Sequence, residues 1–240
     1  MMLFIFVLSC MIAGSLACSD ARCKDPVLAN ELLQVSFLPN KEELRTLCPK
    51  VMTFLECERD FMECPGQSLD ELATSTDKLE AAKAKGMLAG IGLVRDMCDE
   101  DSSFHTDYVA SVSCYREHLI GAAGKCRDDI AKPIEEFFYQ YHADDDEDDV
   151  YEVIFKELRC LRDAYEVACV IGSLGEACGD VAQRTARNVA ERLKDVLGIN
   201  SCKTLQNAAD LKSRFLDFLE LDEQRRSDIE GIFDLFKRRR

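Results

Sequence analysis

The stretch LRCLRDAYEVACVIGSLGEAC, residues 158–178, decides the fold because it combines a helical apolar pattern with three evenly spaced cysteines. From Val150 to Ala168 the apolar positions recur at steps of three and four residues, which is the period of one helix face and not of a strand. Cys160, Cys169 and Cys178 are nine residues apart. Nine residues turn a helix by about 900° and advance it by about 13 Å, so Cys160 and Cys169 lie on opposite faces.

Thiols on opposite faces of a helix cannot bind one metal ion. Zinc sites use close pairs such as Cys-x2-Cys, and no such spacing occurs in this chain. We therefore predict disulfides that tie each cysteine to a different neighbour, with no metal site and no cofactor. Cys48 and Cys57 repeat the nine-residue spacing in LCPKVMTFLECERDFMEC. Whether the two cysteine-rich helices are a true duplication is left open.

The first 17 residues predict a signal peptide. They form an apolar run without charges that ends in Ser15-Leu16-Ala17, small residues suited to cleavage after Ala17. Cleavage removes Cys10 and leaves an even number of cysteines, which favours complete pairing in the oxidising secretory pathway. We predict a secreted, extracellular protein without a membrane span, with one cysteine-rich helical domain at 18–240. The cysteines predicted to form disulfides, in pairs that the sequence does not determine, are Cys18, Cys23, Cys48, Cys57, Cys64, Cys98, Cys114, Cys126, Cys160, Cys169, Cys178 and Cys202.

Helix signals dominate the remaining chain. Capping patterns at Asn40 to Glu43 and at Ser68 to Glu71 predict two helix starts. Pro133 is placed to open a helix, and Gly172 and Gly175 are expected to end the long helix that begins near Val150. The sequence therefore predicts an all-α, disulfide-stapled bundle of roughly seven to nine helices.

The charge of the chain is strongly acidic. The formal net charge of −15 argues against a nucleic-acid partner, because polyphosphate binding depends on excess Lys and Arg. The run ADDDEDD, residues 143–149, lacks the register of a calcium loop and is predicted to be a solvated linker between helices.

Few residues are available for catalysis. The chain has three histidines, His105, His118 and His142, and it lacks Gly-x-Ser-x-Gly, His-Glu-x-x-His and phosphate-binding glycine loops. His118, in CYREH, is interpreted as a surface or half-buried helix residue. We predict no catalytic residues, and therefore a protein that is not an enzyme.

The cysteine order resembles that of a known family. LVRDMCDEDSSFHTDYVASVSCYREHLIGAAGKC and ELRCLRDAYEVACVIGSLGEACGDVAQRTARNVAERLKDVLGINSC are similar to successive blocks of the arthropod 27 kDa haemolymph glycoprotein family. The resemblance spans Cys48 to Cys202 and implies a secreted helical protein of unassigned activity, with no catalytic residues to transfer. No Asn-x-Ser/Thr sequon is present, so the sequence does not support glycosylation at such a site.

Two functions are compatible with these features. The first is a non-enzymatic haemolymph-type or gland-secretion protein that binds a small apolar ligand between stapled helices. The second is a structural or interaction component of a secretion, such as a storage, silk, coat or venom protein, whose acidic surface contacts an extracellular protein. The sequence does not identify the ligand, the ligand-binding residues, the partner, the oligomeric state or the tissue.

Overall fold

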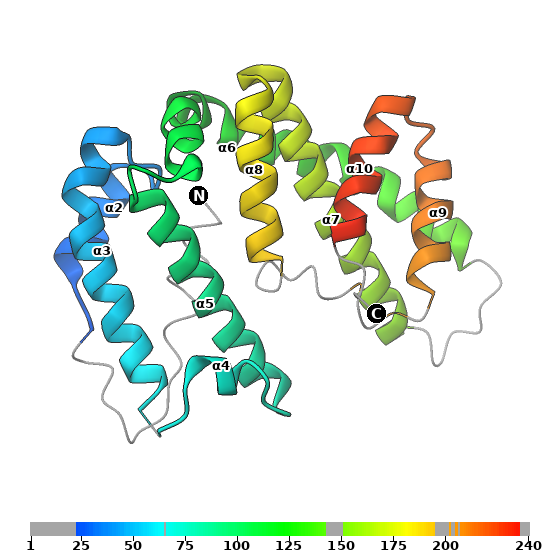
Figure 1. Cartoon of the computed structure of the whole chain (residues 1–240). Coiled ribbons are helices and arrows are strands. Elements are labelled where there is room, and N and C mark those ends of the chain that lie inside the picture. Colours follow the sequence, from blue (N-terminus) through cyan, green and yellow to red (C-terminus); the bar gives the residue numbers. More distant parts are fainter. Residues whose placement is uncertain are drawn as a thin grey trace. The chain divides into compact units, whose positions relative to one another are not determined.

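The computed structural model describes residues 23–64, 66–142, 151–194, 202, 205 and 207–235. These residues form nine helices and no strand, which confirms the prediction of an all-α bundle (Figure 1). The predicted signal peptide (1–17) and the predicted acidic linker (143–149) lie outside the described residues. The helices are α2 (Pro26–Gln34), α3 (Lys41–Met62), α4 (Leu69–Leu72), α5 (Lys78–Cys98), α6 (Ser103–Tyr141), α7 (Tyr151–Cys178), α8 (Asp180–Leu193), α9 (Ala208–Phe218) and α10 (Glu223–Leu235).

The chain divides into two compact units. Of the described residues, those up to Arg116 form unit 1 and those from Glu117 onward form unit 2. The boundary falls within the long helix α6, so this helix contributes its first part to unit 1 and its second part to unit 2.

Unit 1 is built around α3. The helix begins at the predicted capping box, in which the Asn40 side chain accepts from the Glu43 backbone N–H and the Glu43 carboxylate accepts from the Asn40 N–H. Helices α2 and α5 pack against α3, and α4 packs against α5 (Figure 1). Burial of their apolar faces drives this packing, and the core includes Leu55, Leu69, Leu72, Ala84, Met87, Ile91 and Val94.

Unit 2 is built around α7, against which α8, α9 and α10 pack. The predicted apolar face of α7 is confirmed at Leu161, Tyr165 and Ala168, which are all buried. In α9 the buried face is formed by Leu211, Phe215 and Leu216, each fully removed from solvent.

The end of α7 differs from the prediction. The helix continues through Gly172 and Gly175 to Cys178, and the chain turns at Gly179, whose φ of 85° suits glycine. Gly175 has a packing role instead, because a Cβ there would lie 2.9 Å from the side chain of Gln183. The expected helix start at Pro133 is also wrong, because Pro133 lies inside α6.

Two disulfides fix the position of α3 within unit 1. Cys48, the first cysteine of the helix, bonds to Cys98 at the end of α5. Cys57, the second, bonds to Cys23, which precedes α2. The two cysteines of the helix therefore reach different partners, as the nine-residue spacing predicts.

Two disulfides fix α7 in the same order. Cys160, the first cysteine, bonds to the later Cys202, and Cys169, the second, bonds to the earlier Cys126 in α6. In both units the first cysteine of the central helix pairs with a later cysteine and the second pairs with an earlier one.

The other described cysteines are also oxidised. Cys64, Cys114 and Cys178 are disulfide-bonded, and Cys18 lies outside the described residues. Each disulfide that closes a loop of about 40 residues lowers the entropy of the unfolded chain by an amount worth about 4 kcal/mol.

Candidate functional site

The candidate site of unit 2 begins with a buried glutamate. Glu157 lies on the inner face of α7, one turn before Cys160, and its side chain is only 1% exposed. A charged side chain is rarely buried to this extent unless it is paired. Glu157 is therefore the most unusual position on this helix.

Two side chains from other elements bind the Glu157 carboxylate. Nε2 of His142, one residue beyond the end of α6, lies 2.9 Å from Oε2. Nδ2 of Asn207, directly before α9, donates to Oε1 at 2.6 Å and lies 3.4 Å from the Tyr141 hydroxyl. The carboxylate thus connects α7 to the end of α6 and to the start of α9.

Aromatic rings pack against two side chains of this polar group, Tyr141 and His142. The Phe137 ring lies 5.3 Å from Tyr141 and 5.2 Å from Phe215, and these separations are typical of favourable ring contacts. His142 stacks on Phe138 with centroids 5.6 Å apart. Because the Glu157 side chain is 1% exposed, its hydrogen bonds lie in a region of low dielectric constant, which strengthens them.

The outer edge of the site is polar and partly open to solvent. The Arg214 guanidinium lies 5.3 Å from the centre of the Tyr141 ring, and its Nε is 3.1 Å from an Asp210 oxygen. Burial raises the pKa of the Tyr141 phenol, and the hydrogen bond from Asn207 partly offsets this effect. The phenol therefore remains protonated at neutral pH and can donate a hydrogen bond. We call Tyr141, His142, Glu157, Asn207 and Arg214 the Glu157 site.

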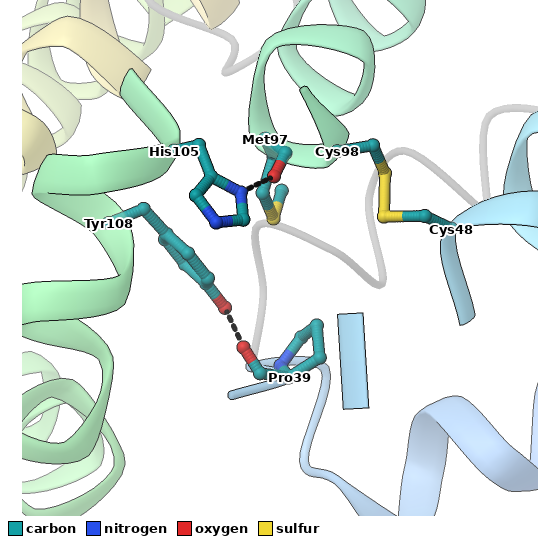
Figure 2. Close-up of a disulfide and its surroundings, with 6 residues drawn as sticks. All are labelled: Pro39, Cys48, Met97, Cys98, His105 and Tyr108. Atoms are coloured by element: carbon teal, nitrogen blue, oxygen red, sulfur yellow. Dashed lines mark hydrogen bonds between the residues drawn. A yellow bond between two sulfur atoms is a disulfide. The ribbon is translucent and has the colours of Figure 1, made fainter. Parts of the chain in front are cut away.

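Unit 1 contains a second buried polar group. Nδ1 of His105 lies 2.6 Å from the Met97 carbonyl oxygen, which accepts in the last turn of α5 (Figure 2). The hydroxyl of Tyr108, one turn further along α6, donates to the Pro39 carbonyl at 2.9 Å. Nε2 of His105 is buried and has no hydrogen-bond partner in the described part of the chain. These contacts position His105 mainly as a link between α5 and α6.

A small apolar cavity is lined in part by Cys48 and Cys98, whose disulfide is drawn in Figure 2. Its volume of about 20 Å³ holds roughly one water-sized molecule. Ligand pockets usually measure about 300–1,000 Å³, so this cavity does not accommodate a ligand of lipid size. Its lining residues are Leu32, Pro39, Leu44, Leu47, Cys48, Val51, Val94, Met97 and Cys98.

The three histidines named from the sequence lie in different surroundings. His105 is buried in unit 1, His142 belongs to the Glu157 site, and the His118 side chain is 42% exposed, as expected for a surface or half-buried position. The sequence patterns did not single out Glu157 or Asn207. One feature of the sequence could have pointed to Glu157: it directly precedes Leu158, which belongs to the predicted apolar face of α7.

Neither a metal centre nor a membrane-spanning helix is found in the part of the chain that the structure describes. Within it, no three His, Cys, Asp or Glu residues are grouped so that they could hold a metal ion. The helices of this part are also too short or too polar to cross a bilayer.

Comparison of the chain with protein-family models, curated proteins and solved structures finds no match. The resemblance to the haemolymph glycoproteins therefore remains a prediction from cysteine order.

Proposed function

We propose that this chain is a secreted, non-enzymatic binding protein of the haemolymph or gland-secretion type. Its ligand is a small, largely apolar molecule that contacts the aromatic edge of the Glu157 site. The observation that carries the proposal is the buried Glu157 carboxylate, held by His142 and Asn207 among aromatic rings. Burying a charged group costs free energy, and proteins commonly retain such groups where they bind or recognise another molecule.

The disulfides support a binding role. Helix α7 is joined to α6 through Cys169 and to Cys202 through Cys160, so the backbone around the Glu157 site is preorganised. A preorganised site loses less conformational entropy when a ligand binds. All described cysteines are in disulfides, which leaves none of them as a thiol nucleophile.

The test is the mass of the protein purified from its own secretion. A native mass higher than the denatured, unreduced mass would reveal a bound molecule. Phe218, whose ring lies 5.6 Å from Phe137, is the position to change, and we expect Phe218→Ala to reduce the bound fraction at least ten-fold. Phe155→Ala is the matched control, because Phe155 is 59% exposed on α7. Equal native and denatured masses would contradict the proposal.

A second candidate function follows from the charge. A formal net charge of −15 gives the chain a strong attraction for a basic extracellular protein. Such a structural or interaction component would associate with that partner at low ionic strength and dissociate as added salt screens the charges. Sedimentation of the secretion at two salt concentrations separates this function from the first.

A further inference from the structure

The Tyr141 hydroxyl is the polar group of the Glu157 site that can still bind a partner. Its oxygen accepts a hydrogen bond from Nδ2 of Asn207 at 3.4 Å, and the same Nδ2 donates to Glu157 at 2.6 Å. Within the described part of the chain, the hydroxyl proton has no acceptor. A hydroxyl whose oxygen already accepts a hydrogen bond becomes a stronger donor, so Tyr141 offers a ligand one directed donor.

The charges around this hydroxyl disfavour an anionic partner. Burial raises the pKa of the Tyr141 phenol, and the hydrogen bond from Asn207 lowers it in part. The Glu157 and Asp210 carboxylates also raise this pKa, because both repel negative charge at the phenol oxygen. Arg214 acts in the opposite direction, but Asp210 balances its charge, with Nε and Oδ2 3.1 Å apart. A ligand carboxylate beside the hydroxyl would meet the same repulsion.

The same surroundings disfavour a cationic partner. The Arg214 guanidinium lies 5.3 Å from the centre of the Tyr141 ring, so a second cation at this ring would be repelled. An ammonium group also has only donors and no acceptor, so it cannot take the hydroxyl proton. The group that fits the Tyr141 hydroxyl is therefore a neutral oxygen with a free lone pair.

Apolar surface lies next to this hydrogen-bond donor. The Phe137 ring is buried and lies 5.3 Å from the Tyr141 ring and 5.6 Å from the Phe218 ring. Tyr141 and Phe218 are themselves only half-buried, so they leave apolar surface at the edge of the cluster. A ligand that covers this edge removes the surface from water, which favours binding.

We propose that the ligand of the Glu157 site is a neutral, largely apolar molecule with one hydrogen-bond-accepting oxygen, to which the Tyr141 hydroxyl donates. Esters, ketones and alcohols with an apolar chain belong to this class, whereas fatty-acid anions and alkylammonium ions do not. The apolar chain contacts the aromatic edge, and the hydrogen bond fixes its orientation. This inference rests on the proposed binding function and names the chemical class of its ligand.

Three probes with the same number of carbon atoms test this class. They are methyl nonanoate, which is neutral and only accepts hydrogen bonds, decanoate and decylammonium. Equilibrium dialysis against the full chain at neutral pH measures their binding, at low ionic strength because charge effects are then largest. We expect methyl nonanoate to bind about ten-fold more tightly than either ion. Equal or tighter binding of decanoate or decylammonium would overturn the proposal.

A substitution separates the hydrogen bond from simple apolar binding, because the neutral probe is also the most apolar one. Tyr141→Phe keeps the ring and removes the hydroxyl. It should weaken the binding of methyl nonanoate about five-fold, the size expected for one neutral hydrogen bond. Tyr139→Phe is the matched control and should bind like the unchanged protein, because Tyr139 lies on the same helix and is 84% exposed. Unchanged binding of methyl nonanoate to Tyr141→Phe would also overturn the proposal.

The class of ligand and the binding function can fail separately. The native mass of the secreted protein tests the function without any probe. A carried molecule that is an acid or an amine would support the function and overturn the neutral class, and so would a carried molecule in a protein that binds none of the three probes. The comparison of the three probes uses the unchanged protein, so it decides the question even where a variant does not fold.

Discussion

The central helices of the two units, α3 and α7, have the same order of disulfide partners. They differ in the charge and the burial of the residue that stands three positions before the first cysteine. Three residues before the first cysteine of each helix stands a charged residue, Arg45 in α3 and Glu157 in α7. Arg45 is 57% exposed and pairs with Glu100, two residues after the partner cysteine Cys98. Glu157 is 1% exposed and binds Asn207, five residues after the partner cysteine Cys202.

This difference shows which features the disulfides fix and which they leave free. In both helices the disulfide brings the segment after the partner cysteine close to the same helical position. In unit 1 that position is in water, and the Arg45 guanidinium lowers the pKa of the Glu100 carboxyl through a hydrogen bond and its charge. In unit 2 the position is buried, with the Glu157 side chain 1% exposed, so the polar contact is made out of water.

Removing one disulfide from α3 and the equivalent one from α7 tests whether the two bonds contribute equally to the free energy of unfolding. We expect Cys48→Ala with Cys98→Ala, and Cys160→Ala with Cys202→Ala, each to cost about 2–5 kcal/mol of unfolding free energy. The two losses should agree within about 1 kcal/mol, because the bonds span similar separations of 50 and 42 residues. Denaturant unfolding under non-reducing conditions measures both. A much larger loss of unfolding free energy for one pair would show that the two disulfides do not contribute equally.

Substitution of Glu157 and substitution of Arg45 should change the stability of the protein to very different extents. Glu157→Ala removes the carboxylate that binds His142 and Asn207, and breaking a buried pair in this way costs about 3–5 kcal/mol. Arg45→Ala removes an exposed pair and should leave the melting temperature nearly unchanged at physiological salt. Calorimetry of both variants measures the contrast. Equal destabilisation by the two substitutions would contradict the difference in burial.

A smaller contrast concerns two tyrosine hydroxyls. Tyr108 donates to the Pro39 carbonyl in a buried part of unit 1, so Tyr108→Phe should cost about 1–2 kcal/mol. Tyr141→Phe removes a longer, 3.4 Å contact at the partly exposed edge of unit 2 and should cost less than about 0.5 kcal/mol. Chemical denaturation resolves this difference. A greater loss for Tyr141→Phe would indicate that its hydroxyl has a larger role in the Glu157 site.

The features of the fold that could be predicted from the sequence are those with local causes. The start of α3 depends on Asn40 and Glu43, three residues apart, and the opposite orientation of Cys160 and Cys169 follows from helix geometry. The end of α7 could not be predicted in this way. A glycine such as Gly175 is tolerated inside a helix when a neighbour packs against it, and that neighbour, Gln183, belongs to another helix.

The Glu157 site could not be predicted from local patterns. His142 and Asn207 are separated from Glu157 by 15 and 50 residues, so their meeting depends on the packing of three segments. Periodicity also assigns a glutamate to the solvent side of a helix. Glu157 is an exception to this rule, because the buried face of α7 in the structure includes its position.

The smallest predicted effect concerns a second acidic residue of α7. Asp163 has an 18% exposed side chain, and burial raises the pKa of its carboxyl although Arg162 and Arg159 lower it in part. A raised folded-state pKa means that the ionised form is disfavoured on folding, so Asp163 reduces stability at neutral pH and has no such effect below the pKa of the unfolded chain. Asp163→Asn should therefore stabilise the protein slightly at pH 7, with the gain disappearing near pH 3. Glu191→Gln, an exposed position on α8, is the control and should show no gain. Melting temperatures of both variants at the two pH values measure this effect, and a loss of stability in Asp163→Asn at pH 7 would mean that the ion pairs with Arg159 and Arg162 outweigh the cost of burial.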